Sequence, residues 1–507
     1  DAIRSLRGQT LRTELYALDG SPRESRPYTV TESQYGIREE RPPASGDSRR
    51  RIFFPHPVAQ RTTQWERGDE PMTQLSFIDE YDVFGQPRRQ VSLAVPRRRD
   101  YRATAPAGLP YLGTITETRY AQRDEPERYQ VDRVSESTSF EILNDGSPSV
   151  FELYRQIQAG AARRKLFGQT FNYYDGEAFV GLPFGKLGDF GAVVRTESLV
   201  LNEEMLREAF RDPDHSSAPD LPSYLKPGSA TNWSAEYPKD FQEQTPTLAG
   251  YLFADGSDHR TRGYFAQTAR VAFDFQISGL PRRGLTVTTR DPFGHDTTVT
   301  YDRPFHLLPV QVTDAAGLTI RAEQDYRVLQ PHLVTDANGN RRAVRFSPLG
   351  LVTAMAVMGK EGEPLGDTVE APGSRLEYDF FAFANSPASK RQPVAVRSIV
   401  REHHVTETDV PSSERNATIE TVEYSDGFGR LLQTRTQAED VLFGDQHFGG
   451  GILSAEQTNS TADAIGRRRA ANGPVNVVVS GWQVYDNKGR VVEKYEPFFD
   501  RGYEYNP

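Results

Sequence analysis

The chain has 507 residues, a formal net charge of −10, 36% hydrophobic residues and no cysteine. This length exceeds the size at which a single hydrophobic core stops growing, so we expect two or more domains or an extended array. The acidic balance argues against a nucleic-acid binder, and the lack of cysteine excludes disulfides and thiolate sites. The sequence contains no apolar run of about 18 residues, so we expect no direct membrane span.

Strand signals dominate the chain. Short β-branched or aromatic segments bounded by Gly, Pro or Asp occur at residues 28–31, 91–95, 297–301, 475–479 and 491–495. Two helices are expected. One runs from about Ser149 to Phe167, and the other covers residues 203–210 after Asn202 as N-cap, with Glu203 and Glu204 in its first turn.

Several segments rich in Pro, Ser, Gly and charge are predicted to be linkers or long loops. They are residues 41–51, 100–108, 211–246, 359–374 and 408–416. We place a soft domain boundary near residue 280. Residues 1–280 are then an irregular β-rich domain with a long loop at 211–246, and residues 281–507 a regular array.

That array rests on a recurring turn motif, Asp-x-x-Gly. It occurs at Asp82–Gly85, Asp291–Gly294, Asp314–Gly317, Asp336–Gly339, Asp426–Gly429, Asp463–Gly466 and Asp486–Gly489. The spacings of 23 and 22 residues between Asp291, Asp314 and Asp336 indicate repeated supersecondary units. The Asp side chain accepts backbone N–H bonds, and the Gly supplies a positive φ that closes a type I turn with a bulge. The motif therefore predicts successive β-hairpins that together form one antiparallel sheet.

The residues around these turns resemble a known family. Tyr485-Asp-Asn-Lys-Gly-Arg490 is similar to the Tyr-Asp-x-x-Gly-Arg core of RHS/YD repeats, and Tyr424-Ser-Asp-Gly-Phe-Gly-Arg430 is a close variant. Segments at residues 11–32, 329–340, 346–352 and 481–499 resemble the middle region of the B component of bacterial Tc (toxin complex) insecticidal toxins. The units at Asp314 and Asp336 depart from the repeat, because they lack the Tyr before Asp and the Arg after Gly.

The resemblance implies an all-β fold with minor α, an extended curved antiparallel sheet of RHS-like hairpins forming part of a hollow shell. In that family the shell sequesters an unfolded toxic polypeptide until it passes through the A component's channel, and the C component closes the shell. The implied partners are thus the C component with its cargo and, through a propeller outside this chain, the A component. The implied location is secreted. The start Asp1-Ala-Ile-Arg has no signal-peptide features, so we expect a piece of a longer protein.

Catalytic motifs are not apparent, and we predict no enzymatic activity, cofactor or metal. The adjacent His403 and His404 would point to opposite faces of a strand, which favours surface histidines over a metal site. Gly185, Gly188 and Gly191 favour turns over a phosphate loop, because no helix follows.

Four basic runs occur at residues 49–51, 97–99, 163–165 and 467–469. We interpret them as solvated charges that flank strands and block edge pairing, and the alternative is that they contact an anionic partner or cargo. Two other functions remain open. One is a teneurin-like adhesion or glycan-binding module, and the other is a β-rich glycosidase, which would need two carboxylates in a cleft.

Overall fold

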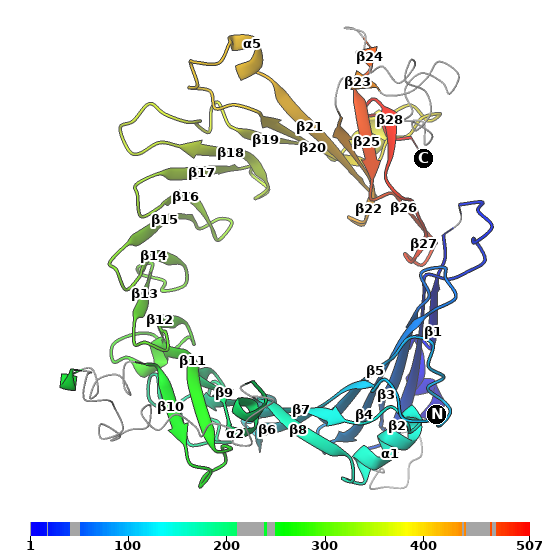
Figure 1. The fold of residues 1–507 in the computed structure, drawn as a ribbon. Helices are drawn as coiled ribbons and strands as arrows, with labels where there is room; N and C mark the ends of the chain where they lie inside the picture. Colours follow the sequence, from blue (N-terminus) through cyan, green and yellow to red (C-terminus); the bar gives the residue numbers. More distant parts are fainter. Residues whose placement is uncertain are drawn as a thin grey trace. The chain divides into compact units, whose positions relative to one another are not determined.

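The computed structural model describes residues 2–17, 19–40, 51–209, 238–240, 249–438, 441–442, 467–468 and 473–506. The chain forms two compact units, Asp1–Thr298 and Val299–Pro507, whereas the sequence placed a boundary near residue 280. In each unit the strands form a curved antiparallel sheet (Figure 1). Most of the expected loop at 211–246 lies outside the described residues.

Unit 1 is a sheet with a few short helices. Its strands are β1 (Arg12–Leu15), β2 (Thr29–Glu39), β3 (Phe53–Gln64), β4 (Met72–Tyr81), β5 (Pro87–Val95), β6 (Leu112–Glu125), β7 (Arg128–Leu143), β8 (Arg163–Tyr174), β9 (Val193–Leu201), β10 (Tyr251–Ala254), β11 (Gly263–Phe273) and β12 (Thr286–Arg290). Its helices are η1 (Ala2–Leu6), α1 (Val150–Gln158), α2 (Glu203–Ala209) and η5 (Asp274–Gln276). Strand β13 (Asp296–Tyr301) spans the division between the units.

The strands of unit 1 follow one another as antiparallel neighbours. Each strand from β1 to β9 pairs with the next along the chain. Strand β9 then pairs with β11, which also pairs with β10 and β12. Most connections between paired neighbours in this meander are short, which agrees with the many turn signals in the sequence, whereas the connection from β9 to β10 is long.

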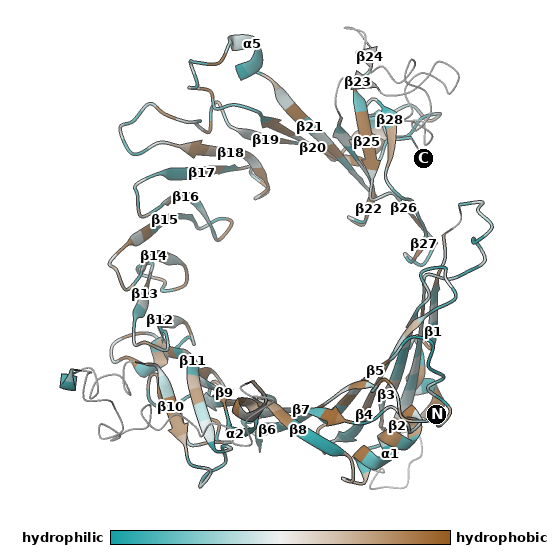
Figure 2. Cartoon of the chain, in the orientation of Figure 1, coloured by the Kyte–Doolittle hydropathy of each residue, from teal (hydrophilic) through white to brown (hydrophobic). Residues whose placement is uncertain are grey.

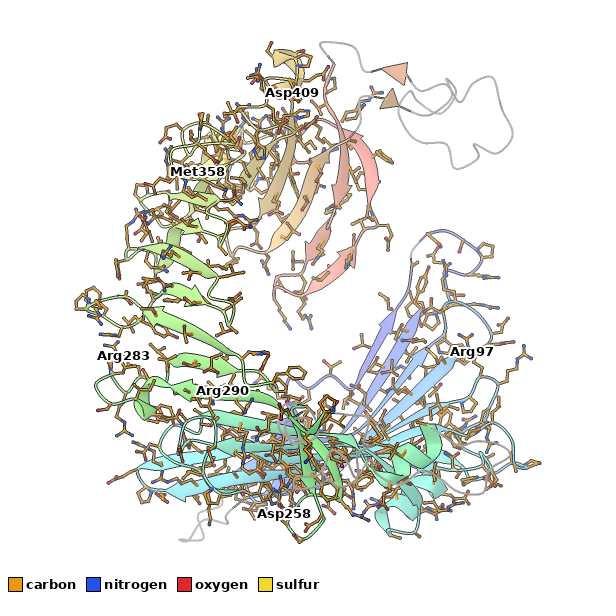
Figure 3. All side chains as sticks on the ribbon, turned by 60° about the vertical axis from the view of Figure 1, so that its left-hand side comes forward. Arg97, Asp258, Arg283, Arg290, Met358 and Asp409 are labelled. Carbon is orange, nitrogen blue, oxygen red and sulfur yellow. The ribbon has the colours of Figure 1, made fainter. Side chains whose placement is uncertain are left out.

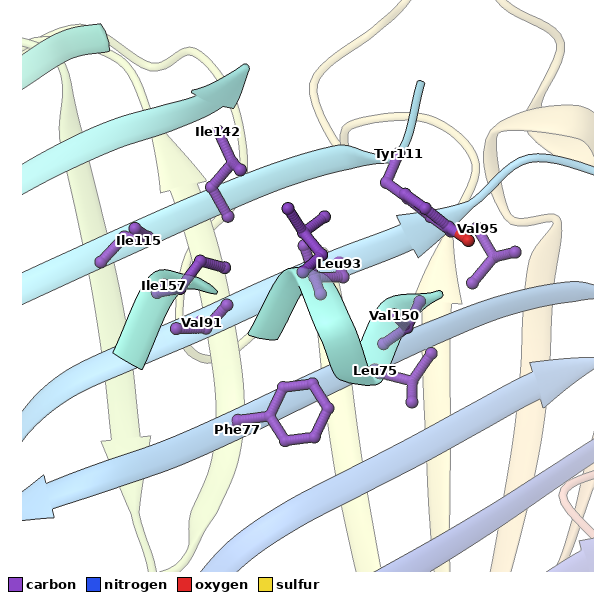
Figure 4. Packing of buried hydrophobic residues seen from close by; sticks show 11 residues of the cluster. Leu75, Phe77, Val91, Leu93, Val95, Tyr111, Ile115, Ile142, Val150 and Ile157 are labelled. Carbon is purple, nitrogen blue, oxygen red and sulfur yellow. The ribbon is translucent and has the colours of Figure 1, made fainter. Parts of the chain in front are cut away.

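The main hydrophobic core of unit 1 lies between α1 and one face of β4 to β7 (Figure 4). On β5, Val91, Leu93 and Val95 are buried while the residues between them are partly exposed, the period-2 pattern of a strand with one covered face. The helix contributes Val150, Leu153 and Ile157 to the same cluster.

Helix α1 is shorter than the sequence suggested. It begins at a capping box in which Ser149 Oγ accepts the Glu152 N–H at 3.2 Å and Glu152 Oε2 accepts the Ser149 N–H at 2.9 Å. It ends at Gln158, because Gly160 takes a φ of +68° and residues 163–167 continue as β8. The second expected helix is α2, where Asn202 Oδ1 accepts the Met205 N–H at 2.7 Å.

Unit 2 is a thinner meander. Its strands are β14 (Pro309–Thr313), β15 (Thr319–Asp325), β16 (Gln330–Thr335), β17 (Arg341–Phe346), β18 (Val352–Met358), β19 (Ser374–Asp379), β20 (Val394–Arg401), β21 (Thr418–Ser425), β22 (Leu431–Gln437), β23 (Val441–Leu442), β24 (Arg467–Arg468), β25 (Asn476–Ser480), β26 (Gln483–Tyr485), β27 (Val491–Lys494) and β28 (Phe498–Arg501). Two short helices, α4 (Ala382–Asn385) and α5 (Ser412–Arg415), lie in its connections.

Pairing in unit 2 is again between chain neighbours from β14 to β22, after which β22 pairs with β25 and β25 with β28. The hairpins β23–β24 and β26–β27 form separate two-stranded sheets. Apolar residues are concentrated in a few strands such as β18 and β25 (Figure 2). Many positions along the other strands of this unit are only partly buried, as expected of a single layer.

The predicted all-β class with minor helix and antiparallel hairpins is confirmed. Among the described residues, no helix combines the length and apolar character needed to cross a membrane.

We expect the α1 core to dominate the stability of unit 1. Leu93 is fully buried, so Leu93→Ala should lower the free energy of unfolding by about 2–5 kcal/mol. Leu112, at 73% exposure, provides the control, and Leu112→Ala should change it by less than about 0.5 kcal/mol. Urea unfolding followed by tryptophan fluorescence measures both, and equal effects would show that this cluster does not hold the unit together.

Candidate functional site

Six of the seven predicted Asp-x-x-Gly turns lie in the described residues, and their backbone geometry is shared. In each, the Asp N–H donates to the carbonyl four residues on, at 2.8–3.0 Å, and the Gly N–H donates to the Asp carbonyl, at 2.9–3.2 Å. The φ of Gly85, Gly294, Gly317, Gly339, Gly429 and Gly489 lies between +76° and +94°. Asp463 and Gly466 lie outside the described residues.

The Asp carboxylate holds each of these turns from inside. One oxygen accepts the N–H groups of the second and fourth residues after it, as Asp336 does from Asn338 at 2.9 Å and Asn340 at 2.8 Å. The same two bonds occur at Asp82, Asp291, Asp314, Asp426 and Asp486. These turns join β4–β5, β12–β13, β14–β15, β16–β17, β21–β22 and β26–β27.

In four of the turns, the second carboxylate oxygen binds the side chain at the position after Gly. Arg490 Nη2 lies 2.7 Å from Asp486 Oδ2, Arg430 Nη2 lies 2.5 Å from Asp426 Oδ2, and His295 and Asn340 take the same place beside Asp291 and Asp336. The pKa of each of these four aspartates is lowered in the folded chain. For Asp486 and Asp291 the main cause is the backbone N–H bond, and for Asp336 it is the Asn340 amide.

The turns at Asp426 and Asp486 also contact each other. The Arg430 guanidinium lies over the Tyr485 ring at 4.7 Å from its centroid, and the Tyr485 hydroxyl donates to the Leu431 carbonyl at 2.9 Å. The Tyr and Arg that flank the Asp and Gly therefore link one hairpin to the next.

Sequence reasoning missed further turns of the same kind. Ser347-Pro-Leu-Gly350 has the same backbone bonds, a Gly φ of +80° and the Ser347 hydroxyl in place of a carboxylate. Asp302, 3% exposed, accepts the Leu307 and Leu308 N–H groups and the Tyr326 hydroxyl in the longer β13–β14 connection. A search that allowed Ser at the first position would have found the former.

In the glycine cluster at residues 185–191, backbone N–H groups bind a carboxylate of the protein itself. Asp175, 3% exposed, accepts the Gly188 N–H at 2.7 Å and the Gly191 N–H at 2.9 Å with one oxygen, and the Ala192 N–H at 3.2 Å with the other. The cluster therefore closes a loop between β8 and β9 around an internal carboxylate.

The histidine pair follows β20 and is not part of a strand, so the expected strand alternation does not apply. His404 Nδ1 lies 2.8 Å from Oδ2 of buried Asp367, and His403 Nδ1 lies 2.9 Å from Glu407 Oε2. Both line a cavity of about 550 Å³ in unit 2. No group of three or more His, Asp or Glu side chains suited to a metal is found in the described part of the chain.

A buried polar cluster in unit 1 has the composition of a catalytic centre but is internally paired. Glu197, fully buried, contacts Arg195 at 2.7 Å, Arg260 at 3.3 Å and the Tyr173 hydroxyl at 3.2 Å. The Tyr173 hydroxyl also bonds His259 Nε2 at 2.9 Å, and burial lowers the pKa of that histidine. Two guanidinium groups on one carboxylate are what a buried charge requires, so we interpret the cluster as structural.

In three of the basic runs, one arginine forms an ion pair in the described part of the chain. Arg51 pairs with Glu39, Arg98 with Glu70 and Arg164 with Glu117. The side chains of residues 467–469 lie outside the described part.

Comparison with known proteins gives one family match. Residues 1–150 match the family described as insecticide toxin TcdB middle/C-terminal region. A search of curated proteins found no match.

Solved structures match over nearly the whole chain. A crystal structure of TcdB2-TccC3 superposes with a TM-score of 0.56 at 20% identity, covering 99% of this chain and 24% of that one. A Photorhabdus luminescens Tc holotoxin pore gives a TM-score of 0.57 at 19% identity, covering 99% and 26%. This chain thus spans about a quarter of the length of those chains, and the likeness establishes a shared fold. The family match and the fold together confirm the predicted resemblance: this chain is similar to the middle region of a Tc toxin B component.

Proposed function

We propose that the chain is a structural shell segment of a Tc-type toxin B component and helps to encapsulate an unfolded toxic polypeptide for delivery. The proposal rests mainly on the superposition of 99% of the chain on the fold of TcdB2-TccC3. The superposed chain is a meander of antiparallel β-hairpins. The partners would be a C component with its cargo and, through a propeller outside this chain, an A-component channel. The location would be extracellular.

The physical mechanism is isolation by a saturated wall. In a continuous antiparallel meander, the N–H and C=O groups of each interior strand bond to its two neighbours. An unfolded chain lying against such a wall finds few free backbone groups to pair with, in contrast to an open sheet edge. The cargo would therefore be held weakly and kept extended.

A non-enzymatic role is consistent with the polar clusters. The carboxylates of Glu197, Asp175 and Asp367 are each bonded to groups of the protein. We further propose that the Asp and Gly residues of the seven turns, Asp463 and Gly466 included, act only to fix hairpin corners.

The encapsulation role predicts protection of a cargo. This chain would replace the structurally matching segment of TcdB2 in a complex with TccC3, and limited proteolysis would follow the C-terminal region of TccC3. We expect that region to be cut as slowly as in the unmodified complex, with isolated TccC3 as the positive control for protease activity. Rapid cutting in an assembled chimera, or failure to assemble, would contradict the role.

The turn role predicts a backbone effect at Gly317. No atom lies within 4 Å of a Cβ built there, so the cost of Gly317→Ala comes from its φ of +80° alone and should be about 1 kcal/mol. Gly427, in the turn at Asp426, is equally open and has no positive φ, so Gly427→Ala should not destabilise. Thermal melting of the two variants tests this, and equal losses would show that the positive φ is not what the turn needs.

The turn carboxylates also predict acid sensitivity. The pKa values of Asp291, Asp336 and Asp486 are lowered in the folded chain, so their contribution is present above the unfolded value of about 3.9 and is lost as pH falls through the folded values. Replacing all three by Asn keeps an acceptor oxygen but removes the titration. The melting temperature of the variant should therefore decline less steeply than that of the unmodified chain between about pH 5 and about pH 2, the range around the unfolded pKa. Parallel curves of melting temperature against pH for the two proteins would refute the assignment.

A further inference from the structure

Unit 1 contains an arginine-lined cleft that the shell role does not use. Its volume is about 440 Å³. The cleft is lined from three parts of the chain: β1 supplies Arg12, β3 supplies Arg61, and the loop after β5 supplies Arg98, Arg99 and Arg102. The run at residues 97–99, noted from the sequence as a possible contact for an anion, thus forms part of a concave surface.

The floor of the cleft is one face of the sheet. Arg12, Glu32 and Arg61 lie directly opposite one another on β1, β2 and β3. The next row on the same face is Val30, Thr63, Thr73 and Val95, from β2 to β5. Val95 also belongs to the α1 core, so a packed cluster supports the floor.

Positive charge exceeds negative charge on this surface. Five arginines line the cleft, against two carboxylates, Glu32 and Asp100. Glu32 is shared, because both Arg12 and Arg61 bond to it. Arg12 also pairs with Glu14, which does not line the cleft, so two carboxylates balance the two arginines of the floor. The excess of positive charge therefore lies in the loop after β5, chiefly at Arg99.

Arg99 differs from the other arginines that line the cleft, because it forms no ion pair with a carboxylate in the described part of the chain. Its Nη2 donates to the carbonyls of Ala103 at 2.7 Å and Pro148 at 3.3 Å. Its Nε is buried and has no hydrogen-bond partner in the structure. A buried N–H without a partner is costly, and an oxyanion in the cleft would relieve that cost.

The loop arginines can turn toward a ligand at little cost. Arg102 pairs with Asp100 while its side chain is 70% exposed, and Arg98 pairs with Glu70 while 77% exposed. Exposed ion pairs of this kind contribute little to stability, so an anion can compete for these guanidinium groups. Arg97 is exposed and is not among the lining residues (Figure 3).

We propose that this cleft binds a compact oxyanion with two or more negative charges, either a phosphate group or paired carboxylates. Arg98, Arg99 and Arg102 of the loop are the direct contacts, because the planar fork of a guanidinium matches both groups in a bidentate manner. Trp65 lines the same cleft and reports on its occupancy.

The test titrates the intact chain with inorganic phosphate and, separately, with citrate, at constant ionic strength set by sodium chloride. Trp65 fluorescence and calorimetry are the readouts. We expect saturable binding of at least one anion, and the tighter of the two identifies the group. Trp65→Phe should abolish the fluorescence response while the calorimetric signal remains.

The variants separate a built site from general charge. Arg98→Gln with Arg102→Gln should weaken binding at least tenfold without changing the melting temperature, because both side chains are exposed. Arg88→Gln with Arg97→Gln removes the same charge from exposed positions outside the cleft and should change affinity less than twofold. The proposal is overturned if neither anion saturates the chain, or if the two double variants lose affinity equally.

Discussion

A carboxylate that accepts two backbone N–H groups of its own turn is the interaction on which the rest of this structure depends. The bond is local, and with a positive-φ glycine one position before the second donor it reverses the chain in five residues, from Asp336 to Asn340 for example. Because reversal is fixed locally, consecutive strands become neighbours, and a long meander forms without crossover connections. The thinness of unit 2 follows, since a meander whose hydrogen bonds are complete needs no second layer to satisfy its backbone.

The two units stabilise a sheet that is exposed to solvent in different ways. Unit 1 covers one face with α1 and buries Leu93 and its neighbours beneath it (Figure 4). Unit 2 depends more on turn chemistry and on contacts between turns, such as Arg430 over Tyr485. This economy fits the proposed shell role, because a solid core would fill the space that a shell wall would enclose.

Local features of this fold could be predicted from the sequence, and features assembled across strands could not. The Asp-x-x-Gly turns and the N-caps at Ser149 and Asn202 depend on residues within about four positions of each other. The predicted end of the helix at Phe167 was wrong, because the apolar spacing continues past Gly160 into β8. In β8 the pairing with neighbouring strands outweighs the helical periodicity of the sequence. The partner of the glycine cluster, Asp175, lies more than ten residues before Gly188 and faces it only once β8 and β9 have paired.

The arginine cleft has the same origin. Arg12 and Arg61 are distant in sequence and share a face only through the register of β1, β2 and β3. The sequence could show a basic run at residues 97–99, but only the structure separates Arg98 and Arg99, which line the cleft, from Arg97, which does not.

The central claim is that this chain is a wall with a cargo on one side. The direct measurement places a photo-cross-linking residue at Met355 or at Arg375 in an assembled complex with a C component. Arg375 lies opposite Ala354 on the neighbouring strand, so it shares the face of Ala354, and Met355 points to the other face. The account predicts that the cargo is captured from one of these two positions and not from the other; capture from both, or from neither, would contradict it.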